Sequence, residues 1–255
     1  MEGMTQHPWH RFVAIGDSFT EGYGDPDPAA PGGLRGWADR VADVLAAGAD
    51  DFAYANLAVR GRLLGRIVDE QVDPAIALEP DLVTVSAGGN DVIRPGADPD
   101  RIAARLDDAV GRLAATGATV VLFTGVDVAF SPVFRHIRGR VAIFNELIRG
   151  VAAHHGALVA DQWSLTSIQR ADLWCEDRLH LNALGHHEVA RMVLTTLGVE
   201  HDLRPSEPEP LPPRSWREAR VDDLAWTRQH LAPWIGRRLR RVSSGDHVPP
   251  KRPGF

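Results

Sequence analysis

Residues 12–22 read FVAIGDSFTEG, and this stretch decides the fold. An apolar run, Phe12–Ile15, leads into Gly16 and then into Ser18. An apolar run that barely alternates is typical of a strand buried on both faces of a parallel sheet, and glycine allows the backbone to turn sharply after it. The stretch therefore predicts a buried strand that places the hydroxyl of Ser18 just beyond its carboxyl end.

Further apolar runs of this kind alternate with longer amphipathic stretches along the chain. The predicted strands are Phe12–Ile15, Phe52–Asn56, Leu82–Ser86, Thr119–Thr124 and Ala157–Asp161. The predicted helices are Gly36–Ala47, Leu63–Ala77, Asp100–Thr116, Arg138–His155 and Ala183–Leu197. Such alternation predicts a doubly wound α/β sandwich with a parallel sheet, whose ligands bind at the carboxyl ends of the strands.

The composition is that of an ordinary globular protein. Hydrophobic residues make up 44% of the 255 residues and charged residues 24%. The net charge of -6 argues against nucleic acid as a partner, because phosphate binding requires a cationic surface. Cys175 is the only cysteine, so no disulfide can form within the chain. No signal-like stretch precedes Arg11 and no apolar run reaches the ~18 residues that span a bilayer, so we expect a cytoplasmic protein.

The character of the chain changes after Gly198. We predict a main domain over residues 1–200, a Pro- and Glu-rich linker over residues 201–215, and a helical extension with a flexible tail over residues 216–255. The tryptophans of the extension favour packing against the main domain, but the extension could also mediate self-association, so the oligomeric state stays open. Its arginines could instead contact an anionic membrane surface. These tryptophans and arginines are Trp216, Trp226, Trp234, Arg237, Arg238, Arg240 and Arg241.

Ser18 has the position that a nucleophile requires. It is expected to be exposed, rigidly held and close to backbone N–H groups that can stabilise an oxyanion. Ser18 could equally cap the helix that follows, since Ser and Asp are favoured at helix N-caps. A phosphate-binding turn is a weaker interpretation, because the Gly-Lys-Ser/Thr ending of a nucleotide loop is absent.

A candidate base lies in residues 177–186, which read DRLHLNALGH. Histidine is the natural base for a serine near neutral pH. Asp177 could fix the tautomer of His180 and stabilise its imidazolium if this segment forms a tight turn. Alone, an aspartate and a histidine at this spacing are more often surface residues. A metal site of His180, His186 and His187 is disfavoured, because neither Cys nor Glu stands beside them at a familiar ligand spacing.

Two short motifs follow the second and third predicted strands. Residues 56–62 read NLAVRGR, and Gly61 there allows the backbone to approach a ligand closely. Residues 86–91 read SAGGND and place the side-chain amide of Asn90 after a strand. Each motif alone could be a simple turn. Together with the other two they would bring a nucleophile, a base with its orienting carboxylate, and oxyanion donors to one rim of the sheet.

The charged neighbours of these residues have plainer interpretations. Asp17 and Asp91 are expected to hydrogen-bond the backbone of their turns. Arg60 and Arg62 could contact an anionic acyl or sugar group, but a solvated surface position is favoured because arginine is mostly exposed.

In this order and spacing, the four motifs closely resemble those of the SGNH/GDSL hydrolase family, over roughly residues 11–198. The resemblance implies a flavodoxin-like three-layer α/β/α sandwich, with a five-stranded parallel sheet here, and serine hydrolase chemistry without a metal or organic cofactor. It also implies that Ser18 is the nucleophile and that Asp177 and His180 complete the triad. The implied oxyanion hole consists of the Ser18 and Gly61 backbone N–H groups and the Asn90 side chain.

We therefore expect a serine esterase that hydrolyses an acyl ester, of the small-ester or acetylated-carbohydrate type, through an acyl-enzyme on Ser18. The alternatives are a lysophospholipase or acyl-thioesterase at the same site, or a non-catalytic binding module on the same fold. The binding module is disfavoured because Ser18 and the Asp177–His180 pair are all present. The acyl chain and the leaving group stay open.

Overall fold

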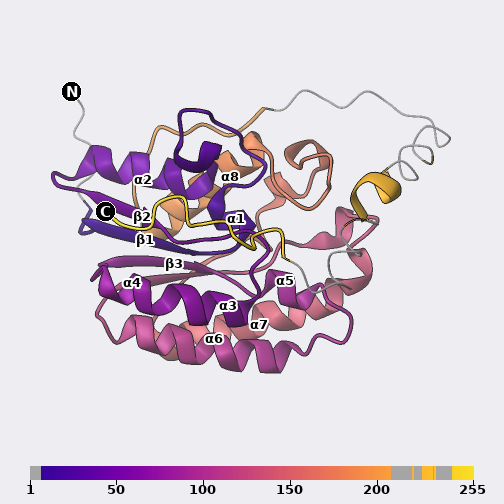
Figure 1. Ribbon diagram of the computed structural model, residues 1–255, viewed down its shortest axis with the longest axis horizontal. Helices are drawn as coiled ribbons and strands as arrows, with labels where there is room; N and C mark the ends of the chain where they lie inside the picture. The colour runs from indigo at the N-terminus through magenta and orange to yellow at the C-terminus, as the bar shows by residue number, and fades with distance from the viewer. Residues whose placement is uncertain (1–6, 208–219, 221–225, 232, 234–242) are drawn as a thin grey trace.

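A five-stranded parallel sheet forms the centre of the computed structural model, which describes residues 7–207, 220, 226–231, 233 and 243–255. The strands lie in the order β2-β1-β3-β4-β5 (Figure 1). Their bounds are β1 Arg11–Gly16, β2 Ala53–Asn56, β3 Leu82–Ser86, β4 Thr119–Phe123 and β5 Leu158–Ala160. The chain first adds β2 on one side of β1 and then continues on the other side with β3. Ligands of such sheets bind where the strand order reverses, which here is at the carboxyl ends of β1 and β3.

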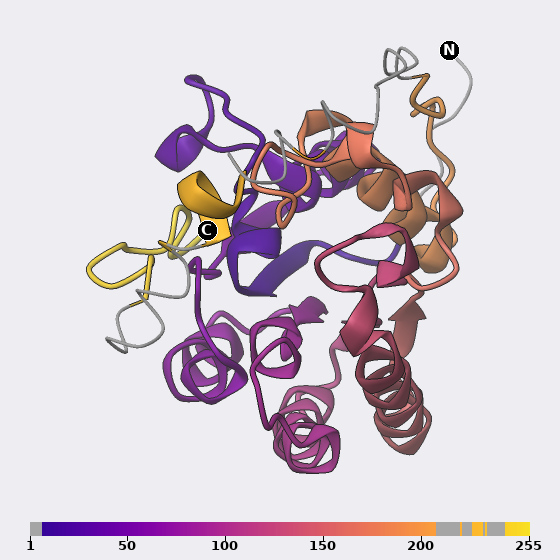
Figure 2. The same ribbon diagram turned by 90° about the vertical axis from the view of Figure 1, so that its right-hand side faces the viewer.

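Helices cover both faces of the sheet, which confirms the predicted α/β/α sandwich (Figures 1 and 2). One face carries α2 (Gly36–Gly48) and α8 (Ala183–Leu197). The other face carries α3 Leu64–Ile67, α4 Asp73–Ala77, α6 Pro99–Ala114 and α7 Arg138–His155. Two short helices, α1 Ser18–Glu21 and α5 Gly89–Val92, follow β1 and β3 directly. Short 3-10 turns span Pro31–Gly33, Val128–Phe130, Arg135–Ile137, Thr166–Ile168 and Ala171–Leu173.

The helix predicted over residues 63–77 is present as a continuous helical run that contains a π-helical turn. A π-helical turn, Val68–Val72, separates α3 from α4, and Pro74 stands in the first turn of α4. Proline has no N–H to donate to the preceding turn, so it is tolerated at the start of a helix and not in its interior. The apolar periodicity of the segment gave no sign of this π-helical turn.

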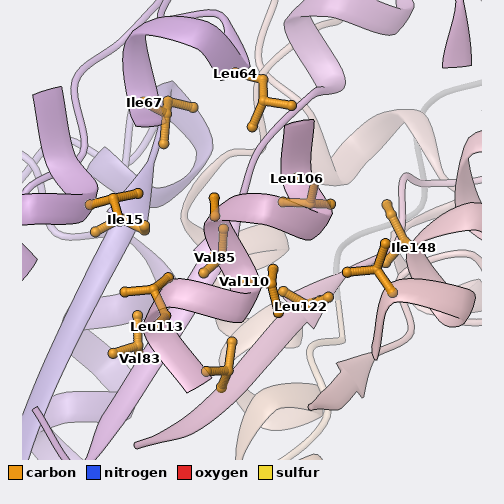
Figure 3. Packing of buried hydrophobic residues seen from close by; sticks show 14 of the residues in the cluster. Ile15, Leu64, Ile67, Val83, Val85, Leu106, Val110, Leu113, Leu122 and Ile148 are labelled. Atoms are coloured by element: carbon orange, nitrogen blue, oxygen red, sulfur yellow. The ribbon is translucent and has the colours of Figure 1, made fainter. Parts of the chain in front are cut away.

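An apolar layer lies between the sheet and each set of helices. Alternate side chains of a strand point to opposite faces, so Ile15 contributes to one layer and Phe12 to the other. Figure 3 shows part of the layer that contains Ile15, in which Val83 of β3 lies beside Leu113 of α6. Burial of each such large side chain contributes about 1.5–3 kcal/mol. These layers fix the strands and so hold the loops at their carboxyl ends in place.

The sequence predicts a flexible tail, but in the structure residues 243–255 lie against the main domain (Figure 1, yellow). Arg252 pairs with Asn56 of the edge strand β2 through two backbone hydrogen bonds of 2.9 and 3.3 Å. The sequence did not reveal these contacts, because glycine, proline and serine give an extended segment the same composition whether or not it is anchored.

The extension also returns to the main domain at Trp226, whose side chain is buried. The π-helical turn η7, Thr227–Leu231, follows it. Trp216, Trp234 and the arginines at 237–241 lie outside the described residues, so self-association and membrane contact stay predictions. Among the helices that the structure describes, each is too short or too polar to cross a membrane.

Candidate active site

Ser18, His180 and Asp177 form one hydrogen-bonded chain at the carboxyl end of β1. Ser18 is the first residue of α1, and its Oγ lies 3.0 Å from His180 Nε2. On the other side of the ring, His180 Nδ1 lies 2.6 Å from Asp177 Oδ2. This arrangement allows the ring to take a proton from the hydroxyl while the carboxylate stabilises the resulting imidazolium.

The helix-cap interpretation of Ser18 is wrong. Asp17 is the N-cap of α1, and its Oδ1 accepts a hydrogen bond of 3.1 Å from the backbone N–H of Phe19. The Ser18 hydroxyl is therefore left free to face His180, although the Ser18 residue is 92% buried, with 8% of its surface exposed.

The loop that carries His180, residues 175–181, is a tight turn held by its own backbone. Asp177 Oδ1 accepts the N–H groups of Leu179 and His180, each at 3.0 Å. The N–H of Cys175 donates to the carbonyl of His180 at 2.8 Å. Burial would raise the pKa of Asp177, but the hydrogen bond and charge of His180 and these backbone N–H groups lower it to about 2. The carboxylate is therefore ionised at any pH at which His180 could act as a base.

Two backbone N–H groups, in the turns that follow β1 and β2, have no acceptor among the described residues. Within the described part of the chain, neither the N–H of Ser18 nor that of Gly61 donates to another residue. Gly61 lies in the loop between β2 and α3, residues 57–63, which we call the β2–α3 loop. Its φ of 71° is in the left-handed region, which favours glycine. Unpaired N–H groups of this kind can stabilise an oxyanion.

Asn90 lies at the same rim, but its amide is already engaged. Asn90 Nδ2 donates to Asp17 Oδ2 at 2.9 Å and to the carbonyl of Arg62 at 3.2 Å. Both hydrogens of the amide therefore have acceptors, and a substrate oxygen would have to share one of them. Asn90 thus ties the turn after β1 to the end of the β2–α3 loop, a role that the sequence did not reveal.

Asp17 and Asp91 both accept hydrogen bonds from backbone groups. Burial raises the pKa of Asp17 to about 6, although the Phe19 N–H, the charge of His180 and the amide of Asn90 each lower it. Asp91 accepts from the N–H of Leu64 at 2.9 Å, so its bond crosses to the start of α3 and does not stay within its own turn.

The expectation that Arg60 and Arg62 are solvated is wrong. Arg60 donates through its side chain and its backbone N–H to the buried carboxylate of Glu21, at 2.7–3.0 Å. Arg62 pairs with Glu70 at 2.8 Å, and only 8% of its side chain is exposed. Arg60 thus reaches a carboxylate 39 residues away in the sequence, whereas the partner of Arg62 lies in the π-helical turn that follows α3.

Tyr23 is a site residue that sequence reasoning missed. Its ring lies 4.5 Å from the His180 ring, centroid to centroid, and the Arg60 guanidinium lies 4.9 Å from the centroid of the same tyrosine ring. The ring therefore restricts the orientation of the His180 imidazole by packing. The sequence offered one sign of this role, because Tyr23 directly follows residues 16–22, GDSFTEG, which contain Ser18.

His180, His186 and His187 are not brought together. His186 is buried, and its ring bonds to the Trp37 N–H and the Tyr23 carbonyl at 3.3 and 3.2 Å. His187 Nε2 instead faces the carbonyl of Arg204 at 2.7 Å. In the described residues, the His, Cys, Asp or Glu ligand atoms that converge closely enough for a metal are those of Asp107, His154 and His155.

Comparisons with known proteins show the family to which the chain belongs. The sequence profile of the GDSL-like lipase/acylhydrolase family matches residues 14–188. The chain therefore belongs to that family of hydrolases, also known as the SGNH family. No curated protein sequence matches the chain.

Solved structures share the fold at low sequence identity. LAE5, an alpha/beta hydrolase enzyme from the metagenome of Lake Arreo, is 24% identical with a TM-score of 0.65, over 76% of this chain and 97% of that one. A catalytic mutant of Axe2, an acetylxylan esterase from Geobacillus stearothermophilus, is 19% identical with a TM-score of 0.64, over 77% and 97%. The psychrotrophic esterase EstA from Pseudoalteromonas sp. is 19% identical with a TM-score of 0.59, over 74% and 97%. Each is matched almost entirely, whereas about a quarter of this chain has no counterpart in them.

Proposed function

We propose that this protein is a carboxylic ester hydrolase that cleaves small acyl esters, of the acetylated-carbohydrate type, through an acyl-enzyme on Ser18. The single observation that carries the proposal is the continuous chain from Ser18 Oγ through His180 to Asp177, at 3.0 and 2.6 Å. A helix cap or a surface histidine has no need of this arrangement, whereas general-base activation of a serine requires it.

In the proposed reaction, Ser18 Oγ attacks the acyl carbonyl carbon while His180 Nε2 takes the hydroxyl proton. The carbonyl oxygen becomes an oxyanion that accepts hydrogen bonds from the N–H groups of Ser18 and Gly61, with Asn90 as a further donor. His180 then gives its proton to the leaving alcohol as the ester bond breaks. A water molecule, deprotonated by His180, attacks the acyl-enzyme and releases the acid and free Ser18.

Two considerations favour a small acyl group on a polar alcohol. The described side chains that pack on the His180 side of the site include Tyr23 and the Arg60–Glu21 ion pair. These groups suit a hydroxyl-rich leaving group better than a long apolar chain, which would leave their charges poorly solvated. In addition, the fold neighbours include acetylxylan esterases, at 19% identity.

The proposal is tested with Ser18→Ala in an assay of 4-nitrophenyl acetate hydrolysis. Wild-type protein should turn the ester over and be labelled by a fluorophosphonate probe, whereas Ser18→Ala should lose both while keeping the wild-type thermal midpoint. Turnover that persists in Ser18→Ala would remove Ser18 from the mechanism. A wild-type protein that fails to react with the probe would favour a binding module.

Substrate class is tested by a panel that contains acetyl, butyryl and decanoyl esters, acetylated xylose and an acetyl thioester. We expect kcat/KM to be highest for acetyl esters. A preference for the decanoyl ester would favour a lysophospholipase, and a preference for the thioester an acyl-thioesterase.

A further inference from the structure

The C-terminal residues 243–252, which we call the C-terminal strap, lie outside the part of the chain that defines the family. The family profile ends at residue 188, and the fold neighbours leave about a quarter of the chain unmatched. The strap nevertheless contacts the β2–α3 loop, which carries Gly61. A segment that the family does not require therefore touches a loop that the proposed chemistry does require.

The first part of the strap is packed directly on Gly61 and its neighbours. The hydroxyl of Ser243 donates to the carbonyl of Gly61 at 3.1 Å. A Cβ built on Gly61 would lie 2.6 Å from Ser243 Oγ and 2.7 Å from Ser244 Oγ. A Cβ built on Gly245 would lie 2.1 Å from the carbonyl oxygen of Arg60. Glycine is thus favoured on both sides of this contact: at residue 245 because the Arg60 carbonyl leaves no room for a Cβ, and at residue 61 because of its left-handed φ and the two serine side chains.

Charged groups reinforce the contact. Asp246 of the strap pairs with Arg62 at 3.3 Å and accepts the N–H of Ser243 at 2.8 Å. The pKa of Asp246 is lowered mainly by that N–H, with smaller contributions from Arg62 and Arg66. The strap is therefore held to the β2–α3 loop on both sides of Gly61.

The far end of the strap is anchored in the main domain by a buried lysine. Lys251 is the only lysine of the chain, and 3% of its side chain is exposed. Its ammonium group donates to the carbonyls of Leu34 and Arg35, at 3.0 and 2.6 Å, and to the carboxylate of Asp39. All three of its N–H groups therefore have acceptors. An ammonium group buried in this way holds its position, since any displacement would leave a charge poorly paired.

The β2–α3 loop is consequently attached both to α1 and to the strap. Glu21 of α1 accepts hydrogen bonds from Arg60, and the strap packs against the Arg60 carbonyl and Gly61. Gly61 directly follows Arg60 and itself contacts the strap, so both attachments restrain its backbone. An oxyanion donor must be held within a fraction of an ångström, since a misplacement of about 1 Å can cost ~100-fold in rate.

We propose that the C-terminal strap is a positioning element of the active site: it presses on residues 60–62 so that the Gly61 N–H is held where the oxyanion forms. The inference rests on the proposed ester hydrolase function for its kinetic consequence. Its structural part, that the strap restrains the β2–α3 loop, stands independently of that function.

The test compares Gly245→Ala with Gly254→Ala in the full-length protein. The added methyl at residue 245 collides with the Arg60 carbonyl, whereas a Cβ at residue 254 meets nothing within 4 Å. Gly245→Ala should lower kcat for 4-nitrophenyl acetate by about 10- to 100-fold with little change in KM, because the lost contact acts in the transition state. Peptides covering residues 57–63 should also exchange amide hydrogen faster than in wild type. Gly254→Ala should match wild type in both measurements.

A second variant keeps the proposal testable if Gly245→Ala does not fold. Ser243→Ala removes the hydroxyl that donates to Gly61 and should lower kcat by about two- to tenfold in the same direction, whereas Ser243→Thr, which keeps the hydroxyl, should recover part of the loss. Unchanged kcat and unchanged exchange at residues 57–63 in the folded variants would overturn the proposal, as would an equal loss in Gly254→Ala. If wild type itself fails to hydrolyse the ester, the ester hydrolase proposal fails, and hydrogen exchange alone decides whether the strap restrains the loop.

Discussion

The two loops that carry the proposed chemistry are held in opposite ways. The His180 loop is held by hydrogen bonds between residues two to five apart, such as those from the two N–H groups that donate to Asp177 Oδ1. The β2–α3 loop is held by partners far away in the sequence: Glu21 is 39 residues from Arg60, and Ser243 is 182 residues from Gly61. The base and its orienting carboxylate therefore come from one local turn, whereas the position of an oxyanion donor depends on the whole fold.

The largest effect is expected within the local turn. Asp177→Asn replaces the carboxylate that accepts from His180 Nδ1 with an amide, whose N–H₂ would favour the wrong tautomer of the ring. We expect kcat for 4-nitrophenyl acetate to fall by about 10⁴-fold, with a thermal midpoint near that of wild type because Asn can still accept from the backbone N–H groups. A loss below about tenfold would mean that Asp177 does not orient the base.

A smaller effect is expected in the distant loop. Asn90→Ala removes the amide that donates to Asp17 and to the Arg62 carbonyl, and with it a proposed oxyanion donor. We expect kcat to fall by about 10²- to 10³-fold, which corresponds to ~2.7–4 kcal/mol of barrier. Because Asn90 and the strap both position the same loop, the losses in the double variant Asn90→Ala/Gly245→Ala should be less than additive. Fully additive losses would indicate that the two act independently.

The smallest expected effect is on the pH dependence of folding stability. It involves the buried His186, which follows the His180 loop in the sequence. Burial is the largest cause that lowers its pKa, from 6.5 to about 4, and it outweighs the nearby carboxylate of Asp25. Between these two pH values the unfolded chain binds a proton that the folded protein does not, so the His186 contribution to folding stability decreases as pH falls from 6.5 towards 4.

Urea unfolding at several pH values across this range measures the effect. The free energy of unfolding should fall with decreasing pH in wild type and fall less steeply in His186→Gln, which keeps an acceptor and a donor but does not titrate. Identical slopes in the two proteins would show that another group is responsible.

The same contrast explains what the sequence could predict. The strands, the apolar stripe of α6 and the Asp177–His180 turn all follow from residues close together in the chain, and the family resemblance added the roles of Ser18 and Gly61. Local pattern could not show that Arg62 is buried against Glu70, or that Gly and Pro residues at 243–255 lie on the main domain. The two hydrogen bonds that Asn90 donates could not be predicted either, because they depend on the positions of Asp17 and the Arg62 carbonyl in the fold.

The position of the strap also sets an order of events during biosynthesis. Its contacts join residues 182 positions apart at Gly61 and 217 positions apart at Leu34. Chains emerge from the ribosome N-terminus first, so the sheet and the Ser18 turn can form while the strap is still inside the exit tunnel. The β2–α3 loop cannot acquire its outer contacts until the strap has emerged. The contacts of this loop are therefore completed only after the strap has been synthesised, later than the hydrophobic layers that support the site.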